Sequence, residues 1–142
     1  MAYAVRSDLE KRVGADRVAS LADHDNDGAE TPEAVDNAIA EASARMDGWL
    51  SGVLDTPLDT TEYPVLRGYA VSIALWLLAL GKGADPDGEE AGLKADHDEA
   101  MRFLMKVGEG KLRLNKESAA APGAIKIKSR TQKYTETLLE TF

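Results

Sequence analysis

One stretch decides the fold class: residues 31–53, TPEAVDNAIAEASARMDGWLSGV. Apolar residues recur there at spacings of three and four, the period of an α-helix with one buried face. Thr31 is the expected N-cap, and Pro32 the first helical residue, where a missing N–H is tolerated. The stretch therefore predicts an amphipathic helix with a core-facing stripe of Val35, Ala38, Ile39, Ala42, Met46, Trp49, Leu50 and Val53.

An earlier helix is expected over about Ser7 to Ala22. Ser7 is the expected N-cap, and Glu10 three residues later completes a capping box. Gly14 is the position where this helix would break or bend.

Two more helices are expected after residue 63. One begins at Pro64, ends near Leu80 before two glycines, and is apolar nearly all round, which predicts a place at the centre of a bundle or between subunits. The other spans about residues 89–109, after a turn at residues 85–88. Four helices with short connections predict an all-α antiparallel bundle, here residues 1–114. Its last helix should bury Leu93, His97 or Met101, Leu104, Met105 and Val107, and Trp49, Trp76 and Leu104 should share one cluster.

Composition narrows the function classes. The chain has 142 residues, no cysteine and a net charge of −8, which excludes thiolate chemistry and argues against nonspecific binding to DNA backbone. Eleven acidic residues and one basic residue lie between residues 23 and 62.

The longest apolar stretch, residues 69–80, is too short to cross a membrane, and the first six residues lack a signal-peptide pattern. A cytoplasmic location is expected.

Residues 115–142 form a second region, a linker and docking tail. Residues 118–123, SAAAPG, are typical of a flexible linker, and residues 124–129 alternate apolar and polar side chains as a β-strand does. A single strand needs an edge to pair with, in its own body or in a partner. We predict that the tail binds a partner through Ile125, Lys126, Ile127, Lys128, Arg130, Lys133, Tyr134, Leu138, Leu139 and Phe142.

An acidic loop offers one candidate metal site. Asp23, Asp25, Asp27 and Gly28 match the opening of a calcium-binding loop. The twelfth position, which should supply a bidentate Glu, is Ala34. The alternative is an acidic surface turn whose side chains bond their own backbone.

No catalytic set emerges from the sequence. Of the two histidines, His97 has the spacing of a residue at the core boundary, and Ser43 and Ser72 have no identifiable histidine partner. We therefore expect a protein that is not an enzyme and has no cofactor, calcium being the one candidate ion.

Five segments together resemble a known family: residues 3–10, 21–28, 35–50, 64–73 and 100–111. In that order they are similar to the small head–tail connector (head completion) proteins of Mu-like phages and prophages. The resemblance covers about residues 3–114, with a looser likeness over residues 130–142. It implies an all-helical protomer without catalytic residues, assembled as a ring of about twelve copies beneath the portal protein. It also implies a C-terminal tail that reaches a neighbouring copy, the portal or the next neck protein.

The resemblance and the residue pattern predict the same function. The chain would be a structural virion protein of the neck, joining capsid to tail at the head–tail junction and assembled in the host cytoplasm. DNA would pass through the ring without specific binding, since an acidic wall repels phosphate. The alternative is a calcium-dependent or regulatory protein-interaction module.

Overall fold

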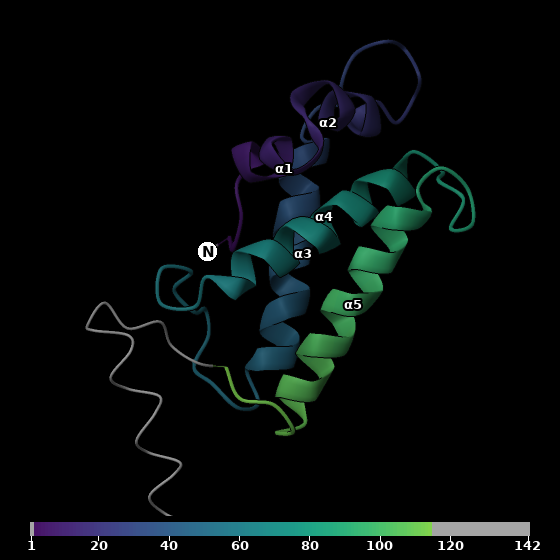
Figure 1. The fold of residues 1–142 in the computed structure, drawn as a ribbon. Helices are drawn as coiled ribbons and strands as arrows, with labels where there is room; N and C mark the ends of the chain where they lie inside the picture. The colour runs from purple at the N-terminus through teal and green to yellow at the C-terminus, as the bar shows by residue number, and fades with distance from the viewer. Residues whose placement is uncertain (1, 115–142) are drawn as a thin grey trace, which may run out of the picture.

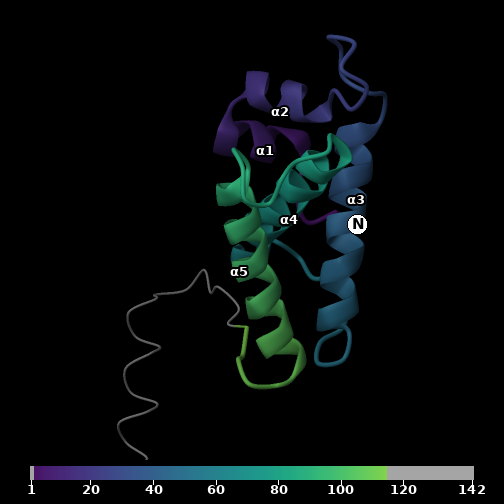
Figure 2. The same cartoon turned by 90° about the vertical axis from the view of Figure 1, so that its right-hand side faces the viewer.

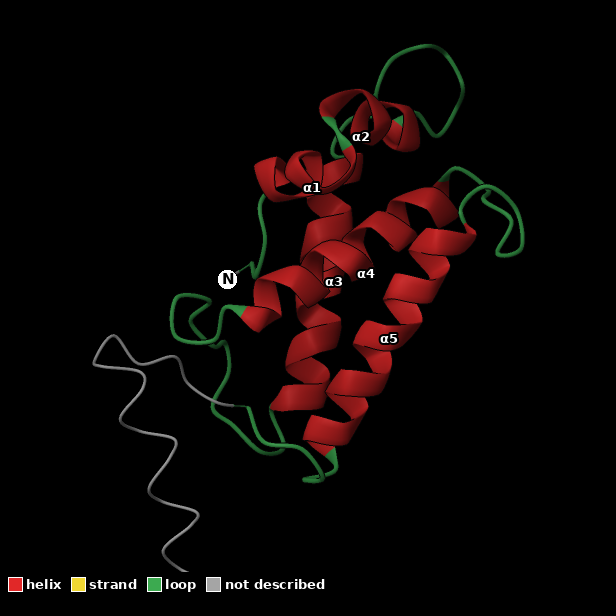
Figure 3. Cartoon of the chain, in the orientation of Figure 1, coloured by secondary structure: helices red, strands yellow, loops and turns green. Residues whose placement is uncertain are grey.

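The computed structural model describes residues 2–114. They form five helices, namely α1 (Arg6–Val13), α2 (Ala15–Ala22), α3 (Ala34–Leu50), α4 (Val65–Gly81) and α5 (Ala91–Gly108) (Figure 1). Figure 3 shows that loops alone connect them in the described part of the chain, so the all-helical prediction is confirmed there. The predicted strand at residues 124–129 lies outside the described residues.

Helix α4 is the centre of the fold. It contacts all four other helices, and ten of its 17 residues are buried. Figures 1 and 2 show α4 crossing between α3 and α5, which lie side by side, while α1 and α2 cover one end. Most of the apolar surface of α4 is thus covered within one protomer, while Val65 and Leu80 near its two ends are exposed. None of the described helices has both the length and the apolar character needed to cross a membrane.

The first helix is split where the sequence predicts a break. Gly14 has a φ of 97° and separates α1 from α2. Its N–H donates to the Glu10 carbonyl at 2.8 Å, and its own carbonyl accepts the Val18 N–H at 3.1 Å. Gly14 therefore ends one helix and begins the next, in a conformation that L-residues rarely adopt.

Both predicted N-caps are wrong. Helix α1 begins one residue before Ser7, where the Val5 N–H donates to the Asp8 carboxylate at 2.9 Å. Helix α3 begins only at Ala34, after Glu33 in the left-handed region, so Pro32 is not its first residue. The Thr31 hydroxyl instead accepts the His24 N–H at 2.9 Å. A bond within the loop between α2 and α3 therefore uses the hydroxyl that the capping pattern assigned to the start of the helix.

The core contains most of the predicted residues. Trp76 and Leu104 are buried, while Trp49 is half-buried and packs against the same core. Two residues were assigned wrongly: Val53 lies beyond the end of α3 and is 45% exposed, and Met105 is 41% exposed. In α5 the buried face carries Leu93, Ala100, Leu104 and Val107, because this face is the one turned toward α3 and α4.

Tyr3 fastens the N-terminal segment to the body. Its backbone N–H donates to the Ser43 hydroxyl at 3.0 Å, and its phenol donates to the Asp47 carboxylate. The phenol oxygen also accepts the Leu58 N–H at 3.0 Å. One buried side chain thus joins the start of the chain, α3 and the connection from α3 to α4.

Tyr3 should make stability fall in alkaline solution. Burial, together with the bond to Asp47, raises the pKa of Tyr3 to about 12 from its ordinary value of 10.0. Between these values the unfolded chain has lost the phenol proton and the folded chain keeps it, so the free energy of unfolding decreases as pH rises. Tyr3→Phe should show a shallower decrease over this window in denaturant titrations. Parallel curves for the two proteins would contradict the assignment.

Gly108 allows α5 to approach α3 closely. A Cβ atom there would lie 2.8 Å from the Trp49 carbonyl oxygen, so Gly108→Ala forces backbone to move. We expect the free energy of unfolding to fall by about 1–3 kcal/mol. Gly92→Ala in the same helix meets nothing within 4 Å and is the matched control, with an expected gain of about 0.5–1 kcal/mol. A gain in both variants would show that the close approach is not needed.

Candidate functional site

The acidic loop lies on the surface between α2 and α3, as predicted. One carboxylate oxygen from each of Asp23, Asp25 and Asp27 lies within 4.8 Å of the others. The two oxygens of Asp23 accept the backbone N–H groups of Asp27 and Gly28, at 3.1 and 3.0 Å. Asp27 in turn accepts the Ala29 N–H at 2.8 Å. These bonds are those of an acidic turn in which side chains hold their own backbone.

The carboxylates of this loop titrate differently. Partial desolvation opposes ionisation of Asp23, but the bonds from Gly28 and Asp27 outweigh it and lower the pKa of Asp23. Desolvation and the nearby negative charge of Asp27 raise the pKa of Asp25. The acidic loop therefore holds negative charges close together, with little positive charge inside the loop to offset them.

His24 attaches the acidic loop to α4, and Lys82, directly after α4, attaches the end of α2. The His24 ring donates from Nε2 to the Leu78 carbonyl at 3.1 Å and lies against Gly81, where a Cβ atom would come within 2.4 Å of the ring. Lys82 Nζ donates to the Ser20 carbonyl at 2.6 Å. Both bonds satisfy carbonyls near helix ends, the role that basic side chains often have there. Sequence reasoning missed this role of His24 because its partners lie more than fifty residues away.

The calcium alternative stays a prediction. Calcium takes six to eight oxygens at about 2.3–2.6 Å, so three carboxylate oxygens within 4.8 Å would be part of a ligand set. The twelfth loop position, Ala34, is buried at the start of α3 and supplies no oxygen from its side chain. Calorimetric titration with calcium checks the point. Heat that disappears when Asp23, Asp25 and Asp27 are changed to Asn would support a calcium site. A titration without heat would leave the acidic turn as the remaining interpretation.

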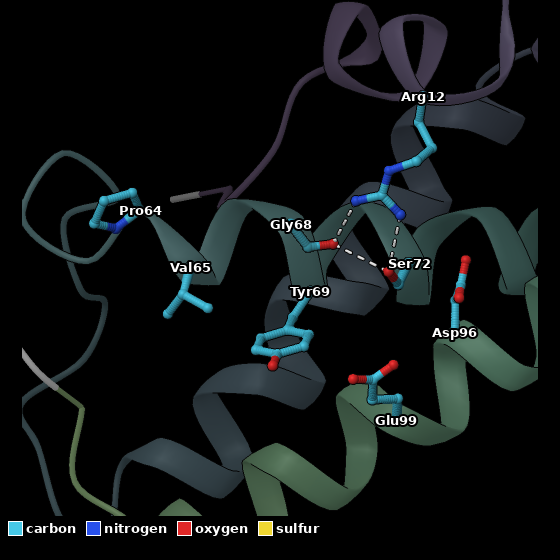
Figure 4. Close-up of a pocket in the computed structure, with 8 residues that line it drawn as sticks. All are labelled: Arg12, Pro64, Val65, Gly68, Tyr69, Ser72, Asp96 and Glu99. Atoms are coloured by element: carbon cyan, nitrogen blue, oxygen red, sulfur yellow. Dashed lines mark hydrogen bonds between the residues drawn. The ribbon is translucent and has the colours of Figure 1, made fainter.

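A surface pocket of about 370 Å³ lies between α1, α4 and α5. In Figure 4, Arg12 reaches from α1 to α4, with Asp96 and Glu99 of α5 across the pocket. Arg12 donates to the Ser72 hydroxyl at 3.1 Å and to the Gly68 carbonyl at 3.2 Å.

Arg12 and Ser72 of this pocket bond to groups of the helical body. The Ser72 hydroxyl donates to the Gly68 carbonyl at 3.1 Å, and neither this carbonyl nor Arg12 can act as its base. His97 lies at the core boundary, as predicted, with its ring 6.4 Å from that of Trp76 and its Nδ1 at 3.1 Å from Asp98. The Trp76–His97 contact joins α4 to α5, whereas the Ser72–Gly68 and His97–Asp98 bonds each stay within one helix.

Acidic side chains cover one part of the body. None of the eleven acidic residues between residues 23 and 62 is buried. They lie on the acidic loop, on α3 and on the connection from α3 to α4. Two of them form the ion pairs Arg6–Glu30 and Arg45–Glu41, each at 2.7 Å. Residues 1–114 carry a net charge of −10, whereas residues 115–142 carry +2.

The predicted partner-binding residues, from Ile125 to Phe142, lie outside the described residues, and their role stays a prediction. The described chain ends at Leu114, next to an apolar groove lined by Val53, Leu54, Val107, Gly110, Leu112 and Arg113. This groove is the feature that sequence periodicity did not reveal, because it forms where loops meet the ends of α3 and α5.

Comparison with known proteins identifies the family. No curated protein matches the chain. A family model described as bacteriophage Mu Gp36 matches residues 3–129, which include nearly all of the described helical body and the first part of the following region. The chain therefore belongs to the bacteriophage Mu Gp36 family.

Proposed function

We propose that this protein is a structural component of the phage neck, forming a homo-oligomeric ring below the portal that joins capsid to tail. The observation that carries the proposal is the match to bacteriophage Mu Gp36 over residues 3–129, because it takes in the whole five-helix body. Family membership favours a virion protein, or a phage protein in the infected cell. The neck position follows from the resemblance to head–tail connector proteins.

The charge of the body supports a role beside DNA without binding to it. Eleven acidic side chains between residues 23 and 62 remain on the surface, and the body has a net charge of −10. A wall of like charge repels phosphate, so DNA would move through the ring without sticking. A protein that held DNA would need clustered Lys and Arg instead.

The residues after the body support a docking role. The described residues contain helices and loops only, so they offer no sheet edge for the predicted strand at residues 124–129. The portal, a neighbouring copy or the next neck protein would supply that edge. Basic residues of the tail would favour an acidic partner surface, and such docking weakens as salt screens the charges.

Mass measurement of the full chain, alone and mixed with portal protein, tests the proposal. We expect a complex with a fixed number of copies per portal ring, and weaker binding at high salt. Changing Lys126, Lys128, Arg130 and Lys133 to Gln should weaken it, whereas changing the exposed Lys11, Arg102 and Lys106 should not. A monomer or dimer that never joins the portal would overturn the neck role and favour the regulatory or calcium-dependent interaction module.

A further inference from the structure

An apolar groove lies open at the end of the body where α3 and α5 finish. It has a volume of about 370 Å³, and its apolar lining includes Val53, 45% exposed, and Leu112, 39% exposed. Figures 1 and 2 show the ends of α3 and α5 close together in this region. Leu114, the last described residue, belongs to the same lining. Neighbouring exposed apolar side chains of this kind usually mark a contact surface.

The chain itself carries a segment with matching chemistry. Residues 134–142, YTETLLETF, contain four large apolar side chains, Tyr134, Leu138, Leu139 and Phe142. Glu136 and Glu140 lie between them in the sequence. The groove provides the opposite charge in Arg113, which has no carboxylate at ion-pairing distance among residues 2–114. An apolar segment with acidic residues thus fits an apolar groove with a basic rim.

The length of the intervening chain allows the segment to reach the groove. Leu138 follows Leu114, at the groove, by 24 residues. A chain of that length can span up to about 80 Å when extended, so the segment can return to the groove. Such a tether keeps the segment at a local concentration on the order of millimolar, well above that of another copy in dilute solution.

We propose that this groove binds residues 134–142 of the same chain. Leu138, Leu139 and Phe142 cover the apolar lining, and an acidic residue of the segment pairs with Arg113. Binding removes apolar surface from water on both the groove and the segment. The consequence for assembly rests on the proposed function: a neck partner that takes this segment must first displace it from the groove.

Disulfide trapping tests the proposal in the full chain, which has no cysteine of its own. Val53→Cys at the groove is paired with Thr141→Cys, a change that leaves every apolar residue of the segment in place. Leu80→Cys, at the far end of α4 and 46% exposed, replaces Val53→Cys in the control pair. We expect the groove pair to close within one chain about tenfold faster than the control pair.

Changing Leu138, Leu139 and Phe142 to Ser separates the effect of apolar binding on the closure rate from the effect of the tether. In the Val53→Cys/Thr141→Cys protein this change should slow closure about tenfold, because the tether is the same and only the apolar contact is lost. An unchanged rate would overturn the proposal, and so would disulfides that form mainly between chains. No portal or other partner is present in this experiment. A negative result in the disulfide experiment therefore does not count against the neck role. Failure of the protein to join the portal does not count against binding of the segment in the groove.

Discussion

Truncation after Ala121 should leave a folded body that no longer joins heads to tails. All five helices end by Gly108, so the cut removes none of the described core. It does remove the predicted strand, the basic run from Lys126 to Lys133 and the apolar segment at residues 134–142. A tethered docking segment raises the effective concentration of each subunit at its partner, and this advantage disappears completely with the segment.

The yield of infectious particles is the measurement. Truncated and full-length chains are supplied to a phage that lacks the gene, and a near-complete loss of yield is expected only with the truncated chain. Circular dichroism of the truncated chain must still show the helical body, which separates lost docking from lost folding. Tails with Gln at positions 126, 128, 130 and 133 should give an intermediate yield that depends less on salt, because the attraction to an acidic partner surface is lost. Normal yield from truncated chains would refute the docking role.

Trp76→Ala should cause the largest loss of stability of any single substitution considered for this chain. Trp76 is 3% exposed and lies in α4, the helix that contacts all the others. Its removal leaves a cavity between α4 and α5, where its ring faces His97. We expect the free energy of unfolding to fall by about 3–5 kcal/mol, from lost burial and the cavity together.

Denaturant unfolding measures this loss, with Leu80→Ala as the control. Leu80 belongs to the same helix but is 46% exposed, so its replacement should change stability by less than about 1 kcal/mol. Fluorescence supplies a second check, because Trp76 should emit as a buried tryptophan and the half-buried Trp49 at longer wavelength. Equal, small losses in both variants would place Trp76 outside the core.

Both N-caps predicted from sequence show why helix ends are hard to predict. The hydroxyl of Thr31 holds the backbone of His24, and Ser7 lies one residue inside α1 because Val5 and Asp8 cap that helix. A cap is worth about 1 kcal/mol, so a competing contact of similar strength can shift the end of a helix. Gly14 was predicted correctly as a break because its backbone freedom is a property of the residue itself.

The sequence by itself determined the helical segments, the all-round apolar character of α4 and the separation of an acidic body from a basic tail. These follow from the spacing of apolar and charged side chains along the chain, which is local information. The tertiary structure alone decided that α4 crosses between α3 and α5, that His24 attaches the acidic loop to α4, and that a groove opens beside Leu112. Each of these depends on contacts between residues far apart in sequence, whose geometry is set by how helices pack and not by their periodicity.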